Sequence, residues 1–95
     1  MSADTQTALQ LRLLTPERTV FEGEAECLTV TGDNGVFEVL PAHEPLLAPL
    51  TVGLMAVRKP GAEGETLFAV HGGFLEVRPG GTEAVILANA AELGD

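Results

Sequence analysis

Glycine and proline interrupt this sequence so often that a long helix is excluded from most of it. Eleven glycines and six prolines divide the 95 residues into short apolar segments. Within several segments apolar and polar residues alternate, as at Leu9, Leu11 and Leu13, which places the apolar side chains on one face of a strand. Short alternating segments between turn residues are typical of an all-β fold. We therefore expect a flattened β-sandwich or barrel of about ten short strands.

The chain is long enough for one domain with a small core. Hydrophobic residues make up 45% of its 95 positions, which suits a single core and leaves no room for a second one. We expect a disordered N-terminal tail over residues 1–7, a β-sandwich domain over 8–91 and a C-terminal end over 92–95. The predicted core consists of the apolar members of the alternating segments: Leu11, Leu13, Leu28, Val30, Phe37, Val39, Phe68, Val70, Leu75, Val77, Val85 and Leu87.

Charge and cysteine content exclude several classes of protein. The net charge of −9, from fourteen acidic and five basic residues, repels phosphate backbones and anionic membranes and argues against nucleic-acid binding. A single cysteine, Cys27, cannot form an internal disulfide and suits a reducing compartment. The sequence shows no signal peptide and no apolar run of the roughly 18 residues that span a bilayer. These features predict a soluble cytoplasmic protein without direct insertion into a membrane.

Residues 32–50 form the most strongly specified stretch of the chain. The turn signal at residues 33–35, Asp-Asn-Gly, predicts a hairpin because Asn and Gly tolerate positive φ. Prolines follow at every fourth residue, and each one fixes φ and removes a backbone donor. We therefore expect a rigid loop through which neither a helix nor a central strand continues. The three prolines are Pro41, Pro45 and Pro49.

Reactive side chains do not form a recognisable catalytic pattern. Cys27 with His43 or His71 offers a thiol and a base, but a cysteine within a strand is more often buried and inert. Three glutamates alternate within residues 22–26, and we interpret them as a solvated strand edge rather than a cation site. The sequence thus predicts no catalytic residue, no cofactor and no metal.

Two residues leave alternatives open. His43 either closes its own loop through a backbone hydrogen bond or contacts another subunit. Lys59 is the only lysine, and a small acidic all-β domain with a lysine is also compatible with a lipoyl- or biotinyl-carrier or an adaptor. Carrier domains present that lysine at a hairpin tip, whereas Pro60 follows it here. The carrier or adaptor remains the alternative function.

Four motifs follow one another in a fixed order along the chain. They are Leu13-x-Thr15-Pro16-Glu17-x-x-Val20-Phe21-x-Gly23, Leu28-x-Val30-x-Gly32, Leu40-Pro41-Ala42-His43-x-Pro45-Leu46-Leu47 and Phe68-Ala69-Val70-x-Gly72-Gly73-Phe74-Leu75-Glu76-Val77. Their order and spacing resemble the N-terminal domain of the epsilon subunit of F-type ATP synthases, over about residues 9–91.

The resemblance implies a ten-stranded β-sandwich at the foot of the central stalk. Such a domain packs against the gamma subunit and the polar loops of the c-ring, performs no chemistry, and couples proton or sodium flow to ATP synthesis at the cytoplasmic face of a bacterial inner membrane. The family pattern places Thr15 and His43 on the gamma side. It places the hairpin on the c-ring side, with four residues of this sequence: Asp33, Asn34, Val36 and Glu38.

Three departures from the family pattern affect these expectations. The family commonly has an acid directly after the turn glycine and a glycine two residues later, where this chain has Val36 and Glu38. The usual Pro-Gly-His triplet has Ala42 in its centre. The family continues with a C-terminal helical hairpin that inhibits ATP hydrolysis and in some members binds ATP, whereas this sequence ends at Asp95, so we expect either a naturally short form or a truncated chain. We therefore expect neither nucleotide binding nor self-inhibition from this chain.

Overall fold

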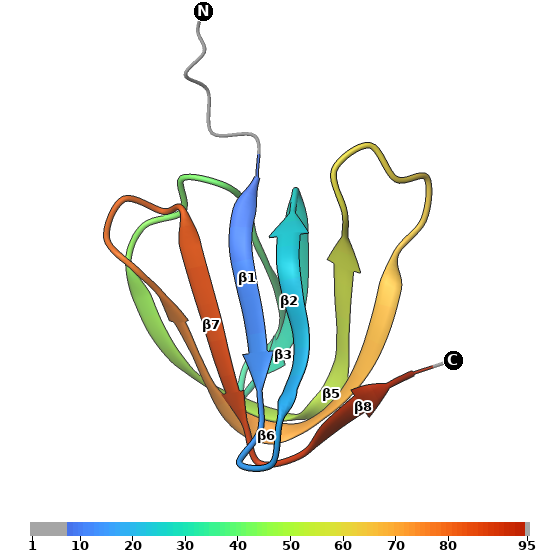
Figure 1. Ribbon diagram of the computed structural model, residues 1–95. Coiled ribbons are helices and arrows are strands. Elements are labelled where there is room, and N and C mark those ends of the chain that lie inside the picture. Colours follow the sequence, from blue (N-terminus) through green and yellow to red (C-terminus); the bar gives the residue numbers. More distant parts are fainter. Residues whose placement is uncertain (1–7, 95) are drawn as a thin grey trace, which may run out of the picture.

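The computed structural model describes residues 8–94, and its secondary structure is entirely β (Figure 1). All strands belong to one sheet in the order β2-β1-β7-β6-β5-β3-β4, with β8 paired to β6. The all-β prediction is thus confirmed, and the described residues contain no helix long and apolar enough to cross a membrane. The predicted tail over residues 1–7 lies outside the described part. The strands are β1 (Leu9–Leu14), β2 (Thr19–Ala25), β3 (Cys27–Gly32), β4 (Gly35–Val39), β5 (Leu46–Arg58), β6 (Thr66–Val77), β7 (Glu83–Ala88) and β8 (Ala91–Leu93).

Strands β5 and β6 bend so strongly that each contributes to two layers (Figure 1). The start of β5 and the end of β6 join β1, β2 and β7 in what we call layer one. The end of β5 and the start of β6 join β3, β4 and β8 in layer two. The prediction of short strands was therefore wrong for β5 and β6, which have 13 and 12 residues. When each bent strand is counted in both layers, the layers contain the roughly ten segments that the sequence predicted.

The bend of β6 is made by two glycines. Gly72 and Gly73 have φ values of 78° and 130°, a region that residues with a side chain rarely adopt. A Cβ on Gly73 would also overlap the backbone carbonyl of Leu87 on β7. The Gly-Gly pair thus marks a fold in a continuous strand rather than the end of one.

Pro49 lies inside β5, so a strand does continue through this proline, where the prediction excluded a central strand. The pairing of β3 with β5 ends where Gly32 meets Leu50, and Pro49 pairs only with Phe74 on β6. On the β3 side Pro49 therefore occupies an edge position, where a missing backbone donor breaks no ladder bond.

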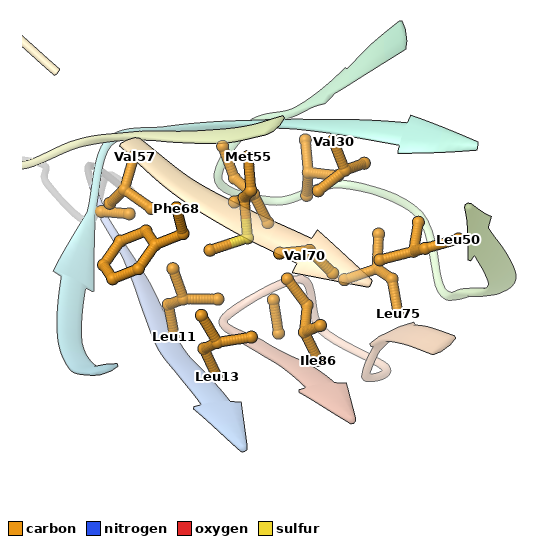
Figure 2. Packing of buried hydrophobic residues seen from close by; sticks show 14 of the residues in the cluster. Leu11, Leu13, Val30, Leu50, Met55, Val57, Phe68, Val70, Leu75 and Ile86 are labelled. Carbon is orange, nitrogen blue, oxygen red and sulfur yellow. The ribbon is translucent and has the colours of Figure 1, made fainter. Parts of the chain in front are cut away.

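The core fills the space between the two layers with aliphatic side chains, one methionine and one phenylalanine (Figure 2). Most predicted core residues are buried, and Phe37 is only partly buried. Leu87 was predicted wrongly: it is 57% exposed, and β7 turns Ala84, Ile86 and Ala88 inward instead. A shift of one residue in the alternation moves every side chain of a strand to the other face. The labelled core residues in Figure 2 are Leu11, Leu13, Val30, Leu50, Met55, Val57, Phe68, Val70, Leu75 and Ile86.

The sheet continues slightly past residue 91, where we expected the domain to end. β8 pairs with β6 through Ala91 opposite Val70 and Leu93 opposite Phe68. The backbone N–H of Gly94 then donates to the carbonyl of Leu67 at 2.8 Å. Residues 92–94 are thus part of layer two.

Candidate interaction surface

The outer face of layer one carries a row of apolar side chains that we call the apolar row, formed by Leu14, Leu87, Phe74 and Pro49. The strand register aligns them across β1, β7, β6 and β5: Leu14 is opposite Leu87, Leu87 opposite Phe74, and Phe74 opposite Pro49. Three interstrand spacings of about 4.8 Å make the row about 14 Å long. Phe74 and Leu87 are 52% and 57% exposed. We take this contiguous row of apolar side chains as the candidate interaction surface.

Sequence reasoning missed the apolar row because it assigned Leu87 to the core. The segment Glu83–Ala88 is apolar at five successive positions after its glutamate, so periodicity does not distinguish its two faces. The sequence did contain one signal. A continuous apolar run is typical of a strand that is covered on both of its faces. In residues 8–94 the inner face of β7 meets the core, and the side chain of Leu87 points outward.

Thr15 lies next to the apolar row, in the turn between β1 and β2. Its hydroxyl oxygen accepts hydrogen bonds from the backbone N–H groups of Glu17 and Arg18, both at 3.3 Å, and its own N–H donates to the Arg18 carbonyl at 2.9 Å. Thr15 therefore shapes the turn. An open hollow of about 340 Å³ adjoins it, lined by Leu14, Thr15, Pro16, Gly73, Phe74, Leu87, Ala88 and Asn89.

His43 lies at the opposite end of layer one from Thr15. The N–H of Ala42 donates to the carbonyl of Gly81 at 2.9 Å, which ties the His43 loop to the turn before β7. β1 and β7 are parallel, so the start of β7 and the end of β1 are at opposite ends of the layer. With about 3.3 Å per residue over β1, Thr15 and His43 are separated by roughly 20 Å. The structure does not bring the two predicted gamma-side residues together.

The His43 side chain closes its own loop, which was one of the two alternatives. Its ring Nδ1 lies 2.7 Å from the carbonyl oxygen of Glu44, and its backbone N–H donates to the Leu40 carbonyl at 3.1 Å. His43 remains partly exposed. This hydrogen bond does not exclude the second alternative, because the other ring nitrogen is not used by it.

The predicted hairpin at residues 33–35 is confirmed, with a different backbone conformation. β3 ends at Gly32, and Gly35 opposite it begins β4. Gly35 has a φ of 114°, whereas Asn34 does not have the positive φ that was predicted for it. The turn is therefore not of type I′, in which both central residues have positive φ.

Three of the four predicted c-ring residues line one hollow. This open hollow of about 270 Å³ lies between the hairpin, Ala48 and Pro49, and Asp33, Asn34 and Val36 are among its lining residues. The fourth residue, Glu38, is not among them and lies further along β4. Pro49 belongs to this hollow and to the apolar row, so the two surfaces adjoin.

Cys27 does not have the properties of a nucleophile. Partial burial raises the pKa of its thiol above the ordinary value, and the nearby negative charge of Glu38 raises it further. A hydrogen bond with the Thr29 side chain and the charge of Arg58 lower the pKa, but the net direction is upward. A raised pKa leaves less thiolate at neutral pH, whereas a catalytic cysteine needs more.

The glutamates of residues 22–26 have partners on neighbouring strands. Glu24 accepts a hydrogen bond from the side-chain amide of Gln10 at 3.1 Å, and a carboxylate oxygen of Glu26 lies 4.0 Å from the guanidinium of Arg58. Glu22 is opposite Arg12 on β1. Across residues 8–94 no three His, Cys, Asp or Glu side chains are close enough to hold a metal ion.

Lys59 is placed unfavourably for a carrier domain. It begins the β5–β6 turn, where its carbonyl accepts a hydrogen bond from the N–H of Ala62 at 3.0 Å. Its ammonium nitrogen lies 5.7 Å from the centre of the Phe21 ring, at cation–π distance. A modified lysine has to project freely from a hairpin tip, whereas this one lies at the base of its turn.

The fold and the surface define a small two-layer β domain with an exposed apolar row beside two turns. Residues 8–94 match the family described as ATP synthase, Delta/Epsilon chain, beta-sandwich domain. The chain belongs to this family.

Bacterial ATP synthase epsilon chains are similar in sequence. That of Halalkalibacterium halodurans is 45% identical over 87 residues, which cover 90% of this chain and 61% of the relative. That of Moorella thermoacetica is 41% identical over 85 residues, with 90% and 61% covered. The chain thus spans about three fifths of the length of these relatives.

Two solved assemblies contain chains of the same fold. In the Euglena gracilis mitochondrial ATP synthase the match has a TM-score of 0.83 at 20% identity and covers 92% of this chain and 54% of the other. In the Tetrahymena thermophila mitochondrial ATP synthase, central stalk and c-ring, the TM-score is 0.71 at 16% identity, with 87% and 64% covered. At sequence identities of 20% and 16%, these matches show a shared fold only.

Proposed function

We propose that this chain is a non-catalytic subunit of the central stalk of an F-type ATP synthase. In that role it joins the gamma subunit to the c-ring and couples proton or sodium flow to ATP synthesis. Membership in the delta/epsilon family supports the complex, and the shared fold with a chain of the Tetrahymena central stalk and c-ring supports the position in the stalk. Bacterial relatives named epsilon chain support a location at the cytoplasmic face of a bacterial inner membrane.

The apolar row is the observation that carries the proposal. Its Phe74 and Leu87 lie on β6 and β7, and the layer-one part of each strand is hydrogen-bonded to neighbours on both sides. A surface that transmits torque has to resist deformation, and a paired sheet does so better than a loop. We place the gamma subunit on this face. A partner that lies along the strands for about 20 Å reaches Thr15 beside the row and His43 at the far end.

The hairpin hollow is the surface that we assign to the c-ring. Asp33 and Asn34 form an exposed polar turn, and Val36 beside them is 67% exposed. An exposed polar turn suits the polar loops of a ring of membrane subunits, and Glu38 extends this contact along β4. Because Pro49 borders both the hollow and the apolar row, the two partners would meet along one edge of the domain.

A pair of double variants tests the assignment of gamma to layer one. We expect Phe74→Ser with Leu87→Ser to weaken the complex with gamma by about 100-fold, since each large apolar side chain contributes about 1.5 kcal/mol when buried. Val52→Ser with Leu54→Ser is the matched control, because these residues are 70% and 57% exposed on layer two. Size-exclusion chromatography with purified gamma should show a complex for the control and separate elution for the layer-one variant. Equal behaviour of the two variants would contradict the assignment.

A further inference from the structure

The His43 loop is held by backbone contacts on both of its sides. The N–H of His43 bonds to Leu40 across the turn, and the N–H of Ala42 bonds to Gly81 on the neighbouring turn. Gly81 is buried, and a Cβ there would overlap the backbone of Ala42. The two turns are therefore in close backbone contact, and the ring of His43 is attached to a well-defined support.

Ala42 adopts a strained conformation in this loop. Its φ of 69° is in the left-handed region, and it is the only residue other than glycine within 8–94 with a positive φ. This conformation is unfavourable for a residue with a Cβ and persists only where the surroundings enforce it. The left-handed conformation of Ala42 sets the direction in which the backbone enters His43.

The hydrogen bond of the ring determines which nitrogen carries the proton. Nδ1 lies 2.7 Å from the Glu44 carbonyl oxygen, and a carbonyl oxygen can only accept, so Nδ1 is the donor. In a neutral imidazole the other nitrogen then has a lone pair and no proton. Nε2 is not hydrogen-bonded within residues 8–94.

We propose that His43 presents Nε2 as a fixed hydrogen-bond acceptor to an N–H or O–H donor of the partner on layer one. This inference rests on the proposed function, in which that partner is gamma, and it specifies the chemistry of the contact. The exposed carboxylate of neighbouring Glu44 favours a donor with positive charge, such as a lysine or arginine side chain. Arg78, whose carbonyl accepts from the N–H of Gly81, has its own side chain near Glu76 and Glu83.

The first measurement uses the chain alone and needs no partner. Nitrogen-15 spectra of the imidazole at pH 8, where histidine rings are mostly neutral, should show the proton of His43 on Nδ1. The spectrum of His71→Leu identifies which of the two ring signals belongs to His43. A proton found on Nε2 would overturn the inference.

The second measurement compares affinities for the purified gamma subunit at pH 8. His43→Gln keeps an acceptor at similar reach, and we expect it to bind gamma within about twofold of the wild type. His43→Leu offers no polar group and His43→Lys offers only donors, so both should bind at least about tenfold more weakly. His71→Leu is the matched control, because His71 is exposed on layer two opposite Val52, and it should leave the affinity unchanged. Melting temperatures confirm that each variant is folded.

The outcomes separate the inference from the proposed function. If the wild type binds gamma and His43→Lys or His43→Leu binds equally well, the acceptor role is overturned while the stalk function stands. If the wild type itself does not bind gamma, the proposed function is overturned and the assigned partner with it.

Discussion

Strands β1 and β7 are parallel neighbours in layer one, yet only the sequence of β1 shows which of its two faces is buried. In β1 the buried Leu9, Leu11 and Leu13, each at most 1% exposed, alternate with Gln10 and Arg12, which are exposed. In β7 both faces are apolar after the first residue. Periodicity therefore predicts the inner face of β1 correctly, whereas it does not distinguish the two faces of β7.

The interface that we propose accounts for this difference between the outer faces of β1 and β7. The outer face of β1 is polar along most of its length and becomes apolar only at Leu14, where the apolar row begins. The outer face of β7 is apolar at Val85, which is only 7% exposed, and at Leu87, which is 57% exposed. A strand whose outer face contacts a protein partner loses the polar positions that reveal its orientation. The ambiguity of β7 is thus a consequence of the interface that we propose.

The largest expected effect separates the two faces of β7. Ile86→Ala should lower the free energy of unfolding by about 3 kcal/mol, because it creates a cavity in the core. Leu87→Ala should lower it by less than about 0.5 kcal/mol, because that side chain is mostly exposed. Urea unfolding measures both. Similar losses for the two variants would mean that Leu87 is a core residue after all.

An intermediate effect is expected when β7 is given the pattern of β1. Leu87→Thr places a polar residue on the outer face without changing the inner one, and we expect it to weaken binding to gamma by about tenfold. The exposed row should also cause the isolated wild-type chain to self-associate at high concentration, and Leu87→Thr should reduce this. Sedimentation velocity over a concentration series checks the second expectation. Unchanged gamma affinity would show that the outer face of β7 is not in the interface.

The smallest effect concerns the backbone at the other end of layer one. Ala42→Gly should raise the free energy of unfolding by about 0.5–1 kcal/mol, since relief of the left-handed strain exceeds the added flexibility of the unfolded chain. A thermal melt detects a change of this size. A loss of stability would show that Ala42 is not strained. Gamma affinity should stay nearly constant, because the position of His43 is retained.

The sequence was sufficient for the fold class and for most of the core. Alternation at Leu11 and Leu13 is visible without a structure, and so is the hairpin at residues 33–35. The sequence was insufficient for the paths of β5 and β6. The Gly-Gly pair is compatible both with the end of a strand and with a bend in a continuous strand. It also could not locate the apolar row, whose members come from four strands and meet only through the register. The raised pKa of Cys27 likewise depends on burial and on Glu38, which are properties of the fold.

Protection of the outer face of β7 by gamma tests the central claim most directly. Leu87→Cys places one reactive thiol on layer one, and Leu54→Cys places one on layer two; each is made together with Cys27→Ser. The two positions are matched, because both leucine side chains are 57% exposed. Maleimide labelling of each variant is measured with and without an excess of gamma. We predict that gamma slows labelling at position 87 at least tenfold and leaves position 54 unchanged. Protection at position 54 without protection at 87 would contradict the account.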